Sequence, residues 1–397
     1  MKRPRILYIC DLNLRNGGAQ RITFDTLECL SRYFNFVIYT DSDIPDDSLR
    51  LLNKLNIPYI IDHSLNEDTI THVIHDYNID SLLIQWENTG WLTLAASLAS
   101  KLSIRSIALV HELPYIHTPT SRFIKNFKAL VLLKLFKDYL KGNLYDIKTL
   151  HAILNVGKAV KKMTTLICVG DASRYYYKRY LGVDCIRIMP SVTIPGEELM
   201  RSNGYYNTFS YDVVFMSARH EPEKGIFDVV KIVKIVKEMM GRDLRVAIMG
   251  KFLFRNVESK FYSLLRKYHL KDDFEVLGFV AESAKYSVLR RSKVFLYPSS
   301  KDVFSISLAE ALAMGTPAVV YDLPFTRMYN IGGVYKVKYK DIKGMAQKVR
   351  EIIELSEKYP DKYLALRKQV SEYVRKTFTL ERTCSELREV IDKALRE

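Results

Sequence analysis

The sequence predicts an α/β protein built from two doubly wound, Rossmann-like domains. Short apolar runs rich in Val, Ile, Leu and Tyr recur along the chain, and they are typical of strands buried on both faces of a parallel sheet. Segments with helical periodicity separate these runs in regular alternation, which favours βαβ units. At 191–211 Pro, Gly, Ser and Asn gather, and a new series of strands then begins, which indicates a second domain.

Composition is that of a folded protein. The chain has 397 residues, of which 48% are hydrophobic, enough for two full cores. Low-complexity tracts are absent, no apolar run reaches transmembrane length, and the first ten residues lead into a strand without a secretory cleavage site. The cysteines form no CxxC pair, so we expect reduced thiols in a cytoplasmic protein, without a zinc site or disulfide framework. They are Cys10, Cys29, Cys168, Cys185 and Cys384.

The first domain is predicted at 1–195. Its strands are expected at 6–10, 36–40, 58–61, 81–86, 106–111, 166–170 and 186–190, with helices at about 46–55, 66–78 and 91–102. Gly17 and Gly18 follow the first strand and are candidates for phosphate or sugar contact, although glycines there also serve simply to make a turn. His111 ends the fifth strand, at the sheet edge where such folds bind ligands. A histidine that merely terminates a strand is the alternative.

A basic segment interrupts this domain. Residues 121–180 hold 13 Lys or Arg and three Asp, a net charge of +10 within the total of +15. Such a segment attracts polyanions, so peripheral contact with the inner membrane surface, with nucleic acid or with an anionic acceptor are candidate roles. We expect a helical insertion at about 120–162, whose polar face changes sides near Val131 and so spoils a single membrane-facing plane. A solvated, partly helical surface is the alternative.

The second domain is predicted at 212–379, after a linker at 196–211. Its strands are expected at 212–218, 246–251, 274–280, 293–297, 318–321 and 334–339, and a last helical segment covers 380–397. Arg219 and Lys224 follow the first of these strands, in a loop that opens a helix near Ile226. Two cations there can clamp a pyrophosphate, Arg as a planar fork and Lys as a point charge. A solvated basic loop is the alternative.

The stretch 297–322 has the most informative pattern. It predicts a strand end, a loop, a helix capped by Ser305 or Ser307, a turn and another strand. Asp302 lies in the loop, and Glu310 lies about one turn inside the helix. Unpaired amides in the first helical turn can accept a phosphate, and a nearby carboxylate can accept ribose hydroxyls. We therefore predict a nucleotide site across this helix N-terminus.

At these residues the chain resembles the retaining GT-B glycosyltransferases of the group 1 kind. Their signature is an acid, a Gly-Phe-Gly loop and then Glu-Ala-Met-Ala-x-Gly-x-Pro. The chain has Asp302-Val-Phe-Ser305, followed by Glu310-Ala-Leu-Ala-Met-Gly-Thr-Pro317, so Asp replaces Glu and the loop has no glycine. Arg219 and Lys224 match the family's Arg-x-x-x-x-Lys-Gly in type and spacing. These motifs cover most of 210–330, whereas 1–195 matches through strand order and two short motifs.

The resemblance implies a GT-B architecture in which 380–397 crosses back onto the first domain. It implies sugar transfer from a nucleoside-diphosphate sugar to an unidentified acceptor, with retained anomeric configuration and without a metal or cofactor. It also implies a role for each candidate residue: Arg219, Lys224 and the amides of Ser305, Ile306 and Ser307 on the diphosphate; Glu310 on the ribose; Asp302 on the sugar; Gly17, Gly18 and Val280 as further donor contacts; and His111 to orient sugar or acceptor.

The departures from the signature leave other functions open. If the loop does not move inward, the shorter Asp302 side chain falls about 1 Å short, which costs on the order of 100-fold in rate. The changed loop at 303–305 therefore favours a non-catalytic nucleotide-sugar or glycan-binding protein of the same fold as one alternative. A nucleotide-sugar epimerase is another, but we find no acid/base set for it. Nucleic-acid binding through 121–180 is compatible with an enzyme.

Overall fold

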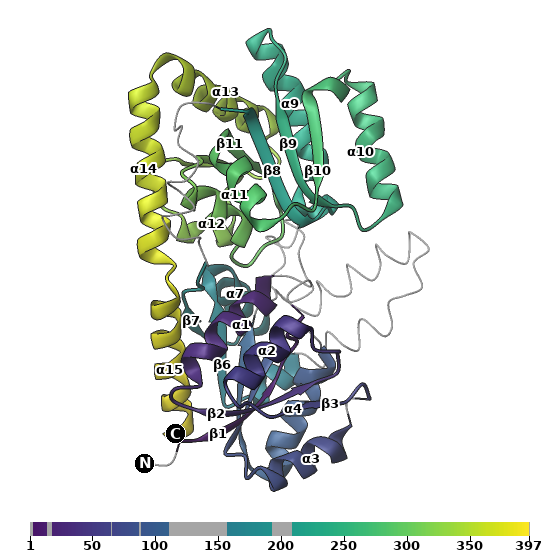
Figure 1. The fold of residues 1–397 in the computed structure, drawn as a ribbon, viewed down its shortest axis with the longest axis vertical. Coiled ribbons are helices and arrows are strands. Elements are labelled where there is room, and N and C mark those ends of the chain that lie inside the picture. Colours follow the sequence, from purple (N-terminus) through teal and green to yellow (C-terminus); the bar gives the residue numbers. More distant parts are fainter. Residues whose placement is uncertain are drawn as a thin grey trace. The chain divides into compact units, whose positions relative to one another are not determined.

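The computed structural model describes residues 3–13, 18–64, 66–86, 89–110, 157–192 and 209–396. It confirms the predicted α/β class, with two parallel sheets and helices packed around them (Figure 1). The chain forms two compact units. The first comprises Met1–Ser191 and Thr379–Glu397, and the second comprises Val192–Phe378. The predicted linker and the predicted basic insertion lie almost entirely outside the described residues.

The first unit contains a seven-stranded sheet of order β3-β2-β1-β4-β5-β6-β7. The direction of winding reverses between β1 and β4, and open α/β sheets bind ligands at such a point. The strands are β1 (Arg5–Ile9), β2 (Asn35–Thr40), β3 (Tyr59–Ile61), β4 (Ser81–Trp86), β5 (Arg105–Val110), β6 (Thr165–Val169) and β7 (Ile186–Ile188). Its helices include α1 (Gly18–Leu30), α2 (Asp46–Lys54), α3 (Glu67–Asp76), α4 (Thr89–Leu102) and α7 (Gly170–Tyr176).

The second unit contains a six-stranded sheet of order β10-β9-β8-β11-β12-β13. Its winding reverses between β8 and β11, so the loops that follow these two strands lie next to each other. The strands are β8 (Tyr211–Arg219), β9 (Val246–Lys251), β10 (Phe274–Gly278), β11 (Ser292–Tyr297), β12 (Ala318–Tyr321) and β13 (Val334–Val337). The helices are α9 (Ile226–Met240), α10 (Arg255–Lys267), α11 (Glu282–Arg290), α12 (Ile306–Ala313), α13 (Ile342–Lys358) and α14 (Pro360–Thr377).

The last helix, α15 (Leu380–Arg396), belongs to the first unit and packs against α1 and β7. Near its start, the Thr383 hydroxyl donates to the Met189 carbonyl at 2.7 Å, and Glu386 accepts from the Met189 amide at 2.6 Å. The Val192 amide donates to the Phe378 carbonyl at 3.0 Å. The chain therefore leaves the first unit and returns to it at adjacent points.

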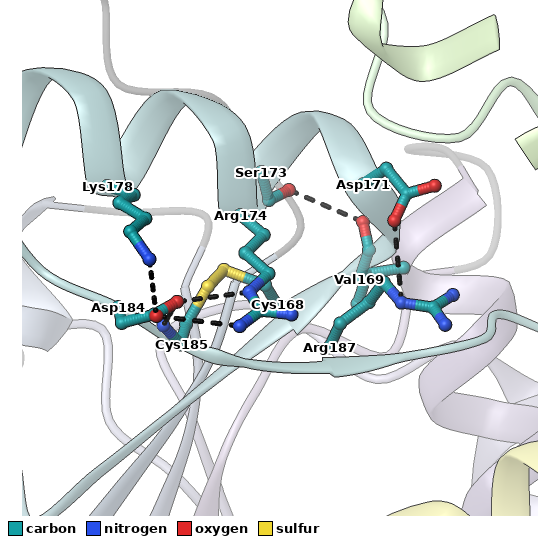
Figure 2. The surroundings of a disulfide bond; sticks show 9 residues. All are labelled: Cys168, Val169, Asp171, Ser173, Arg174, Lys178, Asp184, Cys185 and Arg187. Carbon is teal, nitrogen blue, oxygen red and sulfur yellow. Dashed lines mark hydrogen bonds and ion pairs between the residues drawn. A yellow bond between two sulfur atoms is a disulfide. The ribbon is translucent and has the colours of Figure 1, made fainter. Parts of the chain in front are cut away.

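The expectation of reduced thiols is wrong, because four of the five cysteines are paired. Cys29 on α1 bonds to Cys384 on α15, and Cys168 on β6 bonds to Cys185 just before β7, which Figure 2 shows beside Arg174, Lys178 and Asp184. Cys10 is buried and free. The Cα–Cα distances of 6.3 and 5.7 Å suit disulfides. Such proximity arises from folding, across 355 and 17 positions of sequence, and cysteine spacing alone does not reveal it.

Two features bear on location, and of these the cysteines differ from what the sequence led us to expect. With four thiols paired, the cysteines no longer support a cytoplasmic protein, because disulfides persist mainly in oxidising surroundings. Within the described ranges, no helix combines the length and the apolar character that a membrane span requires.

Candidate functional site

The site is built where β8 and β11 end, in the second unit. β8 ends at Arg219, a 3-10 turn covers Pro222–Lys224, and Gly225 precedes α9 with a left-handed φ of +88°. A Cβ on Gly225 would overlap the Pro298 carbonyl oxygen and lie 2.6 Å from the carbonyl carbon. Only glycine therefore allows the loop after β8 to approach the loop after β11 this closely.

This approach brings Lys224 against Asp302. The Lys224 ammonium donates to Asp302 Oδ2 at 3.1 Å and to the Lys301 carbonyl at 3.1 Å. Burial by itself would lower the pKa of Lys224, but the neighbouring Asp302 carboxylate outweighs it and raises that pKa above its ordinary value. Lys224 therefore remains a cation while its side chain is only 20% exposed.

Tyr297, the last residue of β11, also contacts this carboxylate. Its hydroxyl donates to Asp302 Oδ2 at 2.6 Å, and its ring is buried against Phe295 and Phe215. Burial, reinforced by the Asp302 charge, raises the pKa of Tyr297 above its ordinary value. The phenol is therefore a neutral hydrogen-bond donor across the working pH range.

Arg219 lies at the end of the same strand, but its surroundings are more open. Its Nε lies 3.5 Å from Glu221 Oε1, and its side chain is 51% exposed. A guanidinium carries five N–H donors in a fixed fork, so most of them remain available to a ligand. Arg219 and Lys224 thus supply an exposed cation and a buried one within a single loop.

The N-terminus of α12 faces a tightly held loop. Ser305 is the N-cap, with a left-handed φ of 63°, and its hydroxyl accepts from the Leu308 amide at 3.3 Å. The Tyr329 hydroxyl donates to the carbonyls of Phe304 and Ser305 at 3.0 and 3.3 Å and so holds the loop. Ser305 occupies the backbone conformation that glycine adopts most easily. The predicted capping by Ser305 is confirmed, and helix geometry leaves the next two amides without intrahelical partners.

Glu310 lies further along α12 and is 9% exposed. Its Oε1 accepts from the Lys285 ammonium at 2.7 Å and from the Tyr286 hydroxyl at 3.4 Å. Both partners come from α11, whose packing against α12 delivers them. The carboxylate is therefore held at one oxygen, with a compensating positive charge beside it.

Some predicted residues cannot be compared with this arrangement. Gly17 and His111 lie outside the described residues. Gly18 is the first residue of α1, in the first unit. Val280 is half-buried in the loop after β10, next to Phe279, whose side chain is 78% exposed. The residues that the fold brings together are Arg219, Lys224, Asp302, Ser305, Ile306, Ser307 and Glu310, all in the second unit.

Sequence reasoning missed Tyr297, Lys285 and Tyr286. Tyr297 ends an apolar strand, and its place just before the Asp302 loop is the signal that could have revealed its contact with Asp302. Lys285 and Tyr286 had no such signal, because their contact with Glu310 joins two helices. Helix packing, and not spacing in the sequence, makes them part of the site.

Residues 208–377 match the family model described as glycosyl transferases group 1. The match covers 170 of the 397 residues, all of them within the second unit. The two Rossmann-like parallel sheets, one in each unit, are those of the GT-B fold.

One curated protein is similar in sequence to part of this chain. A phosphatidyl-myo-inositol mannosyltransferase of Mycobacterium leprae (strain TN) is 27% identical over 176 residues, which is 44% of this chain and 45% of that protein. The match thus spans less than half the length of the curated relative.

Solved structures share the fold over the whole chain. A glycosyltransferase from Rickettsia africae ESF-5 has a TM-score of 0.72 and 16% identity, with 100% of each chain covered. Anabaena HepE in complex with UDP and glucose has a TM-score of 0.69 and 15% identity, over 98% of this chain and 100% of its own. Sucrose-phosphate synthase from Thermosynechococcus elongatus has a TM-score of 0.66 and 13% identity, over 99% of this chain and 100% of its own.

Proposed function

We propose that the protein transfers a sugar from a nucleoside-diphosphate sugar to an acceptor, with retained anomeric configuration and without a metal ion. The observation that carries this proposal is the pairing of Lys224 with Asp302 beside the N-terminus of α12, with Arg219 open to solvent at the end of the same strand. The match of residues 208–377 to the glycosyl transferases group 1 model and the UDP bound to a protein of the same fold support a nucleotide-sugar donor.

The barrier to this reaction lies in separating a diphosphate from a sugar that develops positive charge. Groups that stabilise the growing negative charge on the leaving phosphate lower that barrier most when they are already in place. The exposed fork of Arg219, the amides of Ile306 and Ser307 and the dipole of α12 are suited to this task.

Lys224 adds a hydrogen-bond donor whose direction is fixed by its two existing contacts. An ammonium has three N–H groups, and Asp302 Oδ2 and the Lys301 carbonyl account for two of them. The third would serve the diphosphate. Because Asp302 offsets part of the lysine charge, Lys224 is not an uncompensated buried cation.

Two acids would hold the rest of the donor. Glu310 would accept the ribose hydroxyls, and Asp302 would face the sugar and its developing positive charge. His111 would orient the sugar or the acceptor. Retention of configuration rests on the family likeness, and the anomeric configuration of the product, measured by NMR, tests it.

Calorimetric titration of UDP, GDP and ADP into the wild type and Glu310→Ala tests the donor site. One nucleotide should bind, and loss of a charge-assisted hydrogen bond, about 1.5–3 kcal/mol, should weaken it by roughly 10- to 100-fold in the variant. Glu282→Ala is the matched control, because Glu282 lies 3.9 Å from the same Lys285 ammonium, yet its side chain is 61% exposed.

The control should bind like the wild type, and saturating EDTA should change nothing. A wild type that binds none of the three nucleotides at millimolar concentration would refute the proposed donor site. Equal losses in Glu310→Ala and Glu282→Ala would instead show that the charge around Lys285 matters and that Glu310 contacts no ribose.

A further inference from the structure

The four buried carboxylates that the structure describes in the second unit, together with the half-buried Asp302, fall into two groups. Three of them, Asp212, Asp228 and Asp273, have hydrogen-bond partners on both oxygens. The other two, Asp302 and Glu310, have partners on one oxygen only among the described residues. The doubly paired acids bind as follows: Asp212 to Arg242, Lys293 and the Arg245 amide; Asp228 to Lys231, Lys340 and Tyr321; Asp273 to Lys237 and the Leu244 amide.

The two singly paired acids share one pattern. Asp302 Oδ2 accepts hydrogen bonds from Lys224, Tyr297 and, at 3.4 Å, the Ser299 hydroxyl, and Glu310 Oε1 accepts them from Lys285 and Tyr286. Each acid thus has one lysine and one tyrosine on the same oxygen. An acceptor oxygen left unpaired in a largely buried side chain is unfavourable, so buried polar groups are normally satisfied. The exposed fractions of the two acid side chains, 14% and 12%, mean that the second oxygen can still be reached.

The partners themselves are rigid. The Tyr297 ring stacks on Phe295 and Phe215 at centroid distances of 5.5 and 6.2 Å. The Lys285 ammonium lies 4.4 Å from the centre of the Tyr286 ring, and Tyr286 is 4% exposed. Each carboxylate is therefore held by groups that packing has already ordered, which is what keeps a binding group within a fraction of an ångström of its working position.

We propose that Tyr297 and Lys285 are positioning residues of the donor site, each holding one oxygen of its acid so that the other oxygen meets the donor. Asp302 Oδ1 meets the sugar, and Glu310 Oε2 meets the ribose hydroxyls. This inference rests on the proposed function and extends it to two residues outside the family motifs quoted above.

The test compares affinities for a bare nucleoside diphosphate and for its glucose and mannose conjugates, measured by calorimetry. The base is the one that the wild type selects among uridine, guanosine and adenosine. Tyr297→Phe keeps the stacked ring and removes only the hydroxyl. It should leave affinity for the bare nucleotide within about twofold and weaken the better sugar conjugate about tenfold, the value of one hydrogen bond to a charged group.

Lys285→Met should weaken the bare nucleotide and its conjugates alike, about tenfold, because both contain the ribose that Glu310 holds. Tyr321→Phe is the matched control. It removes a buried hydroxyl from Asp228, a doubly paired acid, at 2.9 Å, and it should leave every affinity unchanged.

Three outcomes of these titrations would contradict the inference or the function on which it rests. A Tyr297→Phe variant that binds bare nucleotide and conjugate as the wild type does, or that loses both equally, overturns the role of Tyr297. Unchanged nucleotide affinity in Lys285→Met overturns the role of Lys285. A wild type that binds no nucleoside diphosphate overturns the proposed function itself, and this outcome is distinct from the first two.

Discussion

The close approach at Gly225 leads to a prediction with a built-in comparison. Gly225 and Gly241 stand at the two ends of α9, with left-handed φ angles of +88° and +63°. A Cβ on Gly241 would meet nothing within 4 Å, whereas on Gly225 it would overlap the Pro298 carbonyl. Alanine at either position therefore suffers a similar backbone strain, and only Gly225→Ala adds a collision with main-chain atoms that cannot rotate away.

The magnitudes follow from these two differences. A left-handed backbone conformation destabilises a non-glycine residue by about 1–2 kcal/mol. Replacing glycine by alanine also lowers the conformational entropy of the unfolded chain, which stabilises the folded state by about 0.4–1 kcal/mol. Gly241→Ala should therefore lower the free energy of unfolding by roughly 1 kcal/mol. Overpacking adds about 1–3 kcal/mol, so Gly225→Ala should lose about 2–4 kcal/mol. The two loops must also separate by about 1 Å to restore an ordinary carbon–carbon contact, which moves Lys224 away from Asp302.

Hydrogen exchange measured by mass spectrometry on peptides of α9 and β11 gives the local free energy of opening. Tryptophan fluorescence is unsuitable, because Trp86 and Trp91 both lie in the first unit. Calorimetry then gives the affinity for the nucleoside diphosphate, which Gly225→Ala should weaken by roughly 10-fold or more and Gly241→Ala should not. Equal protection and equal affinity in the two variants would refute the reasoning that this contact positions Lys224.

Two further predictions concern the same loops and use the same exchange measurement. Burial lowers the pKa of His220 from 6.5 to about 4, so the folded state resists a proton that the unfolded state accepts. Stability should be complete above pH 6.5 and fall as the pH drops toward 4, by up to about 3 kcal/mol, and His220→Leu should flatten this slope. An unchanged slope in the variant would contradict the assignment. At Ser305, alanine loses the cap yet keeps the strained φ, so Ser305→Ala should cost about 1 kcal/mol. Ser305→Gly should stay within about 0.5 kcal/mol of the wild type, since relief of strain offsets the weaker cap and the more flexible unfolded chain. The reverse order of stability would mean that Ser305 is not strained.

The places of the candidate residues at strand ends and at a helix start could be predicted, because the signals for them lie within a few neighbouring residues. Arg219 and Lys224 follow a buried strand at a spacing that suits a diphosphate clamp, and Asp302 and Glu310 lie on either side of a recognisable helix start. Capping by Ser305 was likewise visible, because N-caps depend on the few residues around them. Its left-handed backbone was not, since the tertiary contacts of the loop, including the Tyr329 hydroxyl, hold that conformation.

What joins these residues lies outside sequence spacing. Lys224 and Asp302 are 78 positions apart, and Lys285 and Glu310 are 25 apart. The first pair meets because the parallel sheet reverses its winding between β8 and β11. The second meets because α11 packs on α12. The Cys29–Cys384 pair shows the same principle at the greatest separation, and there the expectation from spacing was wrong.

The sequence by itself determined the α/β class, the order of strands and helices and the chemical types gathered at the ends of β8 and β11. These properties follow from periodicity, turn residues and short motifs, each of which acts within a few residues. Only the tertiary structure decided which cysteines pair and which oxygen of each acid is already occupied. The cysteine pairs and the occupied oxygens depend on distances between segments that are remote in sequence. These distances are set by the close packing of the whole folded chain.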